Sequence, residues 1–288
     1  MTDATVYLNG KFMPQNEAMI SPLDRGFLFG DGIYEVIPAY DRKMVGFGPH
    51  IARLQSSLTA IGINLGWPDE KWRTILSELL AQNSGDSLAV YIQVSRGVSP
   101  KRQHGFPDNV EPTLFMMCYA IKAPVNYDDN NNNKGLALVS QQDLRWRQCH
   151  IKSTSLLGNV LHYQSSQDHK VDECLLYNEG NQITEASSCN VFVVKDNQVF
   201  TPPLDSQLLP GITRAIVLDL LKKHTDYQVM EQNISLEHAR LADEIWLTSS
   251  TKNIARAITL DGENIADGKI GKVYIQINSL FNKFKYDY

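Results

Sequence analysis

Residues 143–160 read DLRWRQCHIKSTSLLGNV, and this stretch joins two predicted elements of different kinds. The apolar run at 136–140 before it predicts a strand, and the pattern at about 156–167 predicts a helix. Lys152 lies between the two, in a mixed polar and apolar setting. A lysine in such a setting is by itself most often a surface residue, so its interpretation depends on the rest of the chain.

Strands and helices are predicted on both sides of this stretch without a regular alternation. Asn9-Gly10, between the apolar runs at 6–8 and 11–12, is typical of a two-residue hairpin turn. Further strands are predicted at 33–39, 87–95, 113–120, 174–177, 190–194, 199–200, 244–248 and 254–260, and helices over 51–61, 72–80, 213–224 and 273–284. Such an interleaved order favours an α+β fold over a doubly wound parallel sheet.

A polar segment, APVNYDDNNNNK, separates the two halves of the chain at 123–134. It has no apolar periodicity and contains a proline, so it predicts an exposed connection between domains. We therefore expect a small N-terminal α/β domain at 1–122, a linker at 123–134, and a larger C-terminal domain at 135–288 that carries Lys152.

The composition excludes several classes of protein. The 288 residues are 43% hydrophobic and 20% charged, and 27 basic against 32 acidic side chains give a net charge of −5. This argues against disorder and against nucleic-acid binding through a general basic field. The apolar runs are too short to cross a bilayer, and the start lacks a secretory pattern, so we expect a cytoplasmic protein without membrane contact. Scattered cysteines and histidines predict neither disulfides nor a metal site.

Two short motifs do not support a function. The glycines of RGFLFGDG, at 26, 30 and 32, have the wrong spacing for a dinucleotide-binding loop, and we expect them to form a turn before the next strand. The S-S-T-K run at 249–252 lacks the companion motifs of penicillin-recognising serine enzymes.

Three segments are informative when they are read together. They are RGFLFGDGIYEV at 25–36, the stretch at 143–160, and TEASSCNVFVV at 184–194, which LPGITR follows at 209–214. Their order and spacing resemble the fold type IV pyridoxal-phosphate enzymes: D-amino-acid aminotransferases, branched-chain aminotransferases and aminodeoxychorismate lyases. The likeness covers essentially the whole chain. It implies a two-domain α+β transferase that uses pyridoxal 5′-phosphate.

The resemblance implies the two central roles in the chemistry. Lys152 matches the lysine that forms a Schiff base with the cofactor and then moves a proton between the substrate Cα and the cofactor C4′. Glu185, which we expect at a turn before an apolar strand, matches the acid that pairs with the pyridine nitrogen. That pairing keeps the nitrogen protonated, so the ring can accept the electrons left at Cα.

The resemblance also implies how the cofactor is held. Arg53, in HIARL on a predicted helix, matches an arginine that binds the phosphate. Ile212 and Thr213 begin a predicted helix, and helix N-termini carry the unpaired N–H groups that bind anions. The remaining cofactor contacts implied by the resemblance are Ser188, Leu209, Ser249 and Ser250.

The segment SRGVSPKRQHGFP, at 95–107, discriminates among the family's reactions. Arg102 and His104 match an R-x-H pair that, with Tyr34, holds the substrate α-carboxylate in D-amino-acid aminotransferases. One extra residue, Lys101, leaves the register open, and Arg96 or Lys101 could share the role. The resemblance places this pair in the active site of the neighbouring subunit, so we expect a homodimer.

The resulting hypothesis is a D-amino-acid aminotransferase that interconverts D-alanine and 2-oxoglutarate with pyruvate and D-glutamate. A branched-chain L-amino-acid aminotransferase and an aminodeoxychorismate lyase are the alternatives that retain the same lysine and glutamate. A catalytically silent binding protein on the same scaffold is a fourth possibility. The breadth of accepted side chains stays open.

Overall fold

The computed structural model describes residues 4–123 and 135–288, and these form two compact units. Unit 1 contains the described residues up to 123 together with Ile151–Leu156 and Tyr288, and unit 2 contains 135–150 and 157–287. The linker expected at 123–134 lies, apart from Ala123, outside the described residues, so the domain boundary stays a prediction. No helix in the described part of the chain is long and apolar enough to span a bilayer.

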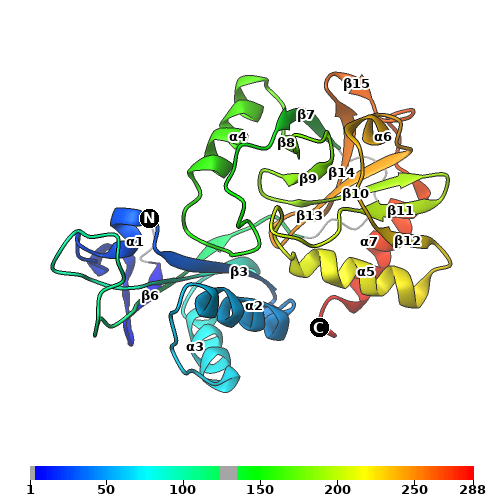
Figure 1. Ribbon diagram of the computed structural model, residues 1–288. Helices are drawn as coiled ribbons and strands as arrows, with labels where there is room; N and C mark the ends of the chain where they lie inside the picture. Colours follow the sequence, from blue (N-terminus) through cyan, green and yellow to red (C-terminus); the bar gives the residue numbers. More distant parts are fainter. Residues whose placement is uncertain (1–3, 124–134) are drawn as a thin grey trace. The chain divides into compact units, whose positions relative to one another are not determined.

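Unit 1 is built on an antiparallel sheet in the order β2-β1-β6-β5-β3-β4. Its strands are β1 (Thr5–Leu8), β2 (Lys11–Pro14), β3 (Gly32–Tyr40), β4 (Lys43–Met44), β5 (Ser87–Ser95) and β6 (Thr113–Ala120). The helices α1 (Arg25–Phe29), α2 (Phe47–Ala60) and α3 (Asp69–Ala81) and the 3-10 turn η1 (Gln15–Glu17) complete the unit. Figure 1 shows α2 and α3 beside each other, and their apolar faces, including Ile51, Leu54 and Leu76, enter the same core as Ile37 and Val90 of the sheet.

Unit 2 is built on a mixed sheet in the order β12-β11-β10-β13-β14-β7-β8-β9, with β15 beside β14. Its strands are β7 (Leu136–Gln142), β8 (Glu173–Tyr177), β9 (Ile183–Ala186), β10 (Asn190–Lys195), β11 (Gln198–Thr201), β12 (Gln228–Glu231), β13 (Glu244–Ser249), β14 (Asn253–Leu260) and β15 (Glu263–Asn264). Its helices are α4 (Leu157–Asp168), α5 (Ile212–His224), α6 (Leu236–Arg240) and α7 (Lys272–Phe284), and α5 packs against both α7 and β13. The parallel pairs are β11–β12, β14–β7 and β7–β8.

The structure differs from the sequence-based expectations at three places. The glycine-containing segment at 25–30 is a short helix, α1, because the Asp24 side chain accepts from the Gly26 N–H at its start and Gly30 ends it with φ +65°. Glu185 lies within β9 and is buried, where a turn was expected. Ile151–Leu156 belongs to unit 1, where backbone hydrogen bonds join it to β3, although Lys152 was expected in the C-terminal domain.

Candidate active site

Lys152 is held beside the first residues of β3. The Tyr34 N–H donates to the Lys152 carbonyl at 3.0 Å, and the Lys152 N–H donates to the Ser57 hydroxyl at 3.4 Å. The half-buried Lys152 side chain places Nζ 4.2 Å from the centre of the Tyr34 ring. The structure therefore brings together the residues predicted as the reactive lysine and as a substrate contact.

The glycines of the FGDG motif explain why this segment can approach so closely. A Cβ on Gly30 would collide with the Ser155 hydroxyl, and one on Gly32 would lie 3.3 Å from the Thr154 hydroxyl and 2.9 Å from a backbone oxygen of β5. The Thr154 and Ser155 hydroxyls both donate to the Gly30 carbonyl, at 3.0 and 3.1 Å. The two glycines thus make room for the lysine-bearing segment.

Arg53 is buried on α2 and forms a two-pronged ion pair with Glu35 of β3. Its Nε and Nη2 lie 2.6 and 2.8 Å from the two carboxylate oxygens, and His50 Nδ1 lies 2.8 Å from one of them. Burial alone would raise the pKa of Glu35, but Arg53 and His50 outweigh it and lower that pKa far below its usual value. Glu35 was missed in the sequence, although an acid inside an apolar strand pattern already indicates a buried partner.

Arg102 and His104 lie exposed on the loop between β5 and β6. The Phe29 ring lies near both, with its centre 5.1 Å from the Arg102 guanidinium carbon and 5.6 Å from the centre of the His104 ring. Arg25, which is buried, donates to three consecutive carbonyls of this loop at 2.7 to 3.3 Å; these belong to Gln103, His104 and Gly105.

An ion-pair cluster fixes Arg25 in turn. Asp31 accepts from Arg25 Nε at 2.7 Å and from Arg96 at 2.8 and 3.0 Å. Arg96, considered as a second carboxylate contact, is therefore buried against Asp31, whereas Lys101 is exposed. Arg25 and Asp31 stand in the RGFLFGDG motif, but their pairing across the loop was not predictable from spacing.

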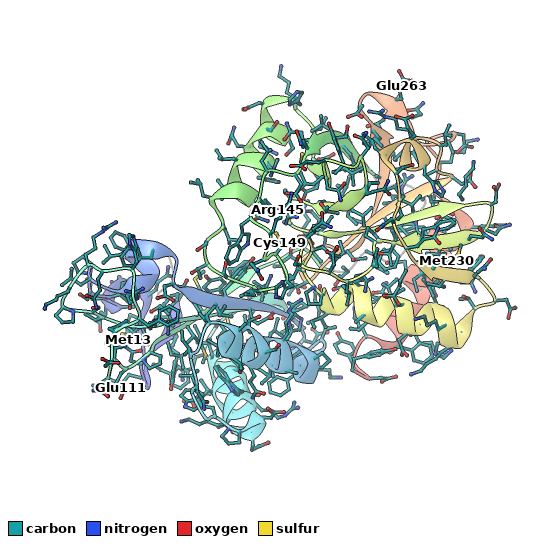
Figure 2. The ribbon with its side chains drawn as sticks, in the orientation of Figure 1. Met13, Glu111, Arg145, Cys149, Met230 and Glu263 are labelled. Carbon is teal, nitrogen blue, oxygen red and sulfur yellow. The ribbon has the colours of Figure 1, made fainter. Side chains whose placement is uncertain are left out.

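Glu185 is the centre of the corresponding group in unit 2. Arg145 Nη1 donates to its Oε1 at 2.5 Å, and Oε2 accepts from the Asn190 amide and from the Leu209 N–H, each at 3.2 Å. Figure 2 shows Arg145 and Cys149 on the segment that joins β7 to α4. Arg145 was quoted within the motif at 143–160 without a role, so the sequence indicated its presence but not its partner.

The loop that contains Leu209 continues directly into α5. Gly211 caps this helix without a side-chain hydrogen bond, and Ile212 and Thr213 form its first turn. A Cβ on Gly211 would collide with Asn190 Oδ1, and the Asn190 amide also donates to the Leu209 carbonyl at 2.8 Å. The predicted ring-nitrogen partner and the predicted anion-binding turn are therefore coupled through one asparagine.

The end of β13 carries the other predicted hydroxyls. Ser249 and Ser250 are half-buried, and Ser249 accepts from the Lys252 N–H at 3.1 Å. Thr248 lies opposite Asn190 in the β10–β13 pair, which places their side chains on the same face of the sheet. The buried Thr248 hydroxyl has no hydrogen-bond partner within the described residues, so it is available to a bound polar group.

Ser188 is exposed, and its hydroxyl donates to Glu173 at 3.0 Å. The buried Glu173 carboxylate also accepts from Lys252 Nζ at 3.1 Å and from the Ser187 hydroxyl. Neither Glu173 nor Lys252 was singled out as a site residue, because nothing in their spacing links two positions so far apart in the chain.

The chain resembles known proteins along almost its whole length. Residues 32–258 match the family model of class IV aminotransferases. The D-alanine aminotransferase of Staphylococcus haemolyticus is 36% identical over 280 residues, which is 97% of either chain. That of Listeria innocua serovar 6a is 34% identical over 276 residues, covering 96% of this chain and 94% of its own.

Solved structures share the fold. A T.th. branched-chain amino acid aminotransferase with pyridoxamine 5′-phosphate has a TM-score of 0.90 at 21% identity, covering 100% of this chain and 95% of its own. The Escherichia coli branched-chain enzyme has a TM-score of 0.89 at 21% identity, covering 98% and 94%. At this identity the likeness concerns the fold alone.

The chain belongs to the class IV aminotransferases, an enzyme family with a mixed α+β fold. The resemblance, fold class and enzyme class predicted from the sequence are therefore confirmed. Between the D-amino-acid and branched-chain predictions, the full-length sequence relatives support the first.

Proposed function

We propose that this chain is a pyridoxal-phosphate-dependent aminotransferase that exchanges the amino group of D-alanine with 2-oxoglutarate. The observation that carries the proposal is the coupling of Glu185 to the first turn of α5. A buried carboxylate suits a protonated ring nitrogen, and a helix start without a side-chain cap suits a phosphate. Glu185 of β9 and the start of α5, which are connected through Asn190 and Leu209, thus offer the two ends of a phosphorylated pyridine ring partners of opposite charge.

The residues present fit this cofactor. In unit 2, Glu185 would hold the ring nitrogen, Leu209 would pack on the ring, and Ile212 with Thr213 would donate to the phosphate. The Thr248 hydroxyl, which has no hydrogen-bond partner in the part of the chain that the structure describes, supports a polar ligand at this face of the sheet. Further contacts are proposed for Arg53, Ser188, Ser249 and Ser250, although Arg53 and Ser188 already bind buried glutamates.

Lys152 is proposed to bond to the cofactor aldehyde and, once released, to move the proton between the substrate Cα and C4′. The cofactor supplies the electron-accepting ring for this proton transfer. The backbone hydrogen bonds from Tyr34 and to Ser57 hold the lysine segment on the sheet and helix of unit 1, which fixes the backbone position from which Nζ extends.

The substrate α-carboxylate is proposed to bind Arg102, His104 and the Tyr34 hydroxyl. A guanidinium fork with two further donors suits a carboxylate. With the carboxylate held on one side and the proton delivered from a fixed face, only one enantiomer presents its Cα hydrogen correctly. The similarity to D-alanine aminotransferases supports the D enantiomer.

We propose that the enzyme is a homodimer to which each protomer contributes its loop at 95–107. Large apolar side chains near this loop and α1 are exposed, which is unfavourable in water and typical of an interface. They are Met19, Ile20, Phe27, Val98 and Phe106. Light scattering on purified protein should give twice the mass of 32.4 kDa. A cytoplasmic location likewise stays a prediction, which fractionation would test.

A parallel assay tests the function. The purified enzyme, loaded with pyridoxal phosphate, would be given D-alanine, L-leucine and aminodeoxychorismate, with 2-oxoglutarate as acceptor for the amino acids. We expect pyruvate and D-glutamate from D-alanine, and no reaction after Lys152→Ala. Activity with L-leucine alone would support a branched-chain enzyme, and elimination from aminodeoxychorismate would support the lyase. Borohydride reduction that leaves no label on Lys152 would contradict the whole proposal.

A further inference from the structure

The segment between β7 and α4 contains a buried guanidinium that the roles above leave unused. The Arg145 side chain is 3% exposed, and its Nη1 donates to Glu185 at 2.5 Å. Burying an arginine is unfavourable unless it is fully paired, so its burial next to a carboxylate indicates a specific task.

Asp143 fixes the orientation of this guanidinium. It accepts from Arg145 Nε at 3.0 Å and Nη2 at 2.8 Å, and the Thr184 hydroxyl donates to Asp143 at 2.8 Å. Arg145 Nη2 also donates to the Gln207 carbonyl at 3.1 Å. The planar fork is therefore held from several sides, and Nη1 is directed at Glu185.

We propose that Arg145 is a positioning residue that keeps Glu185 ionised and correctly oriented toward the cofactor ring nitrogen. This inference rests on the function proposed above, because Glu185 has that partner only if the cofactor binds there. It adds a residue whose role is exerted through the glutamate that it contacts.

The charges around Glu185 explain why such a residue is needed. The pKa of the Glu185 carboxyl lies above its ordinary value, because burial raises it, and Asp143 adds to this, by more than Arg145 and the Leu209 N–H lower it. Arg145, Asp143 and Glu185 together carry one net negative charge, which matches one protonated ring nitrogen. Without Arg145, two buried carboxyl groups would face each other, and Glu185 would take up a proton in place of the ring.

The test compares Arg145→Gln and Arg145→Lys with Arg147→Gln as the matched control. Arg147 lies two residues further along the same segment, but its side chain is 82% exposed and, among the described residues, forms a long 3.7 Å pair with Glu179. Removing its charge therefore changes the same segment without changing the surroundings of Glu185.

The first measurement uses the cofactor-free protein and does not depend on activity. Carbon-13 NMR of labelled glutamate side chains, assigned with Glu185→Gln, follows the titration of Glu185. We expect Arg145→Gln to move its midpoint to higher pH, Arg145→Lys to move it less, and Arg147→Gln to leave it in place. An unchanged midpoint in Arg145→Gln would overturn the inference.

The second measurement uses protein loaded with pyridoxal phosphate. A ring nitrogen that has lost its proton withdraws fewer electrons, so the absorption band of the bound cofactor should titrate at a higher pH in Arg145→Gln, as in Glu185→Gln. We expect kcat with D-alanine to fall about 10- to 100-fold, the loss of one charged hydrogen bond. Arg145→Gln combined with Glu185→Gln should lose little more than Glu185→Gln alone.

The outcomes separate this inference from the proposed function. If the wild-type protein shows no cofactor band, the proposed function fails, whatever the glutamate titration shows. If the wild type is active and Arg145→Gln keeps both the spectrum and kcat, Arg145 has only a structural role. Should Arg145→Gln fail to fold, Arg145→Lys provides the test, since lysine keeps the positive charge but lacks the planar guanidinium. If Arg145→Lys shows the wild-type titration of Glu185 and the wild-type cofactor spectrum, an oriented guanidinium is not needed.

Discussion

Arg53 and Glu35 form a buried two-pronged ion pair that joins α2 to β3, with 2.6 Å between Nε and Oε1 and 2.8 Å between Nη2 and Oε2. Neither side chain is more than 8% exposed. An ion pair in this position has lost its hydration, so each partner depends on the other.

Glu35→Gln should destabilise the protein by about 3–5 kcal/mol, because it removes the carboxylate that pairs with the buried Arg53 guanidinium. Chemical denaturation followed by circular dichroism measures the loss. As a control, Glu237→Gln breaks an exposed pair with Arg240 and should change stability by less than about 1 kcal/mol. If the two variants lost the same free energy, the buried pair would not stabilise unit 1 in this way.

Arg25→Lys should weaken substrate binding without contacting the substrate. Lysine keeps the charge near Asp31 but cannot donate to the carbonyls of Gln103, His104 and Gly105 together. The loop that carries Arg102 should then lose its fixed shape. We expect KM for D-alanine to rise about tenfold, the effect of one charged hydrogen bond, with a smaller change in kcat.

A double variant shows whether Arg25 acts through the loop. When Arg25→Lys is added to Arg102→Ala, KM should rise little further, because the Arg102 contact with the substrate, which Arg25 supports, is already gone. If the two substitutions raised KM independently, so that their fold-changes multiplied in the double variant, this role of Arg25 would be contradicted.

Acid should destabilise unit 1 through Asp31. Burial alone would raise the pKa of Asp31, but Arg96 and Arg25 outweigh it and lower that pKa. Because the pKa is lower in the folded than in the unfolded protein, this contribution to stability is complete above the ordinary aspartate pKa of about 3.9 and is lost as the pH falls through the folded value. Melting temperatures measured from pH 7 to pH 2 should fall below about pH 4, and less steeply in Asp31→Asn.

Gly211→Ala should weaken cofactor binding by displacing a neighbouring residue of the proposed cofactor site. The added Cβ would collide with Asn190 Oδ1 and displace the amide that binds Glu185 and the Leu209 carbonyl. Overpacking of this kind costs about 1–3 kcal/mol of stability, and the affinity for pyridoxal phosphate should fall with it.

Asn190→Ala provides the control for this substitution. Once the colliding amide is removed, adding Gly211→Ala should have little further effect on the melting temperature or on a cofactor titration. A Gly211→Ala protein with wild-type affinity would show that the collision is relieved elsewhere.

Local patterns in the sequence predicted most of the secondary structure. The hairpin turn at Asn9 and Gly10 has the positive φ values of 46° and 97° that its type requires, and two strands of unit 1, β5 and β6, have the predicted bounds. Periodicity was insufficient for the five-residue helix α1, since its start depends on one Asp24 side chain and it is too short to show a repeat. Periodicity was also insufficient for Glu185, because an acidic residue next to an apolar run predicts a turn unless its buried partners are known.

The sequence by itself determined the family, the order of the elements and the residues capable of the chemistry, because residue type and short-range spacing carry that information. Only the tertiary structure decided which charges meet. Arg145 and Glu185 are 40 positions apart, and Arg25 and the Gln103 carbonyl are 78 apart. Such pairs form only where segments distant in the sequence pack together and exclude water from both charged groups. No local pattern in the chain encodes that packing.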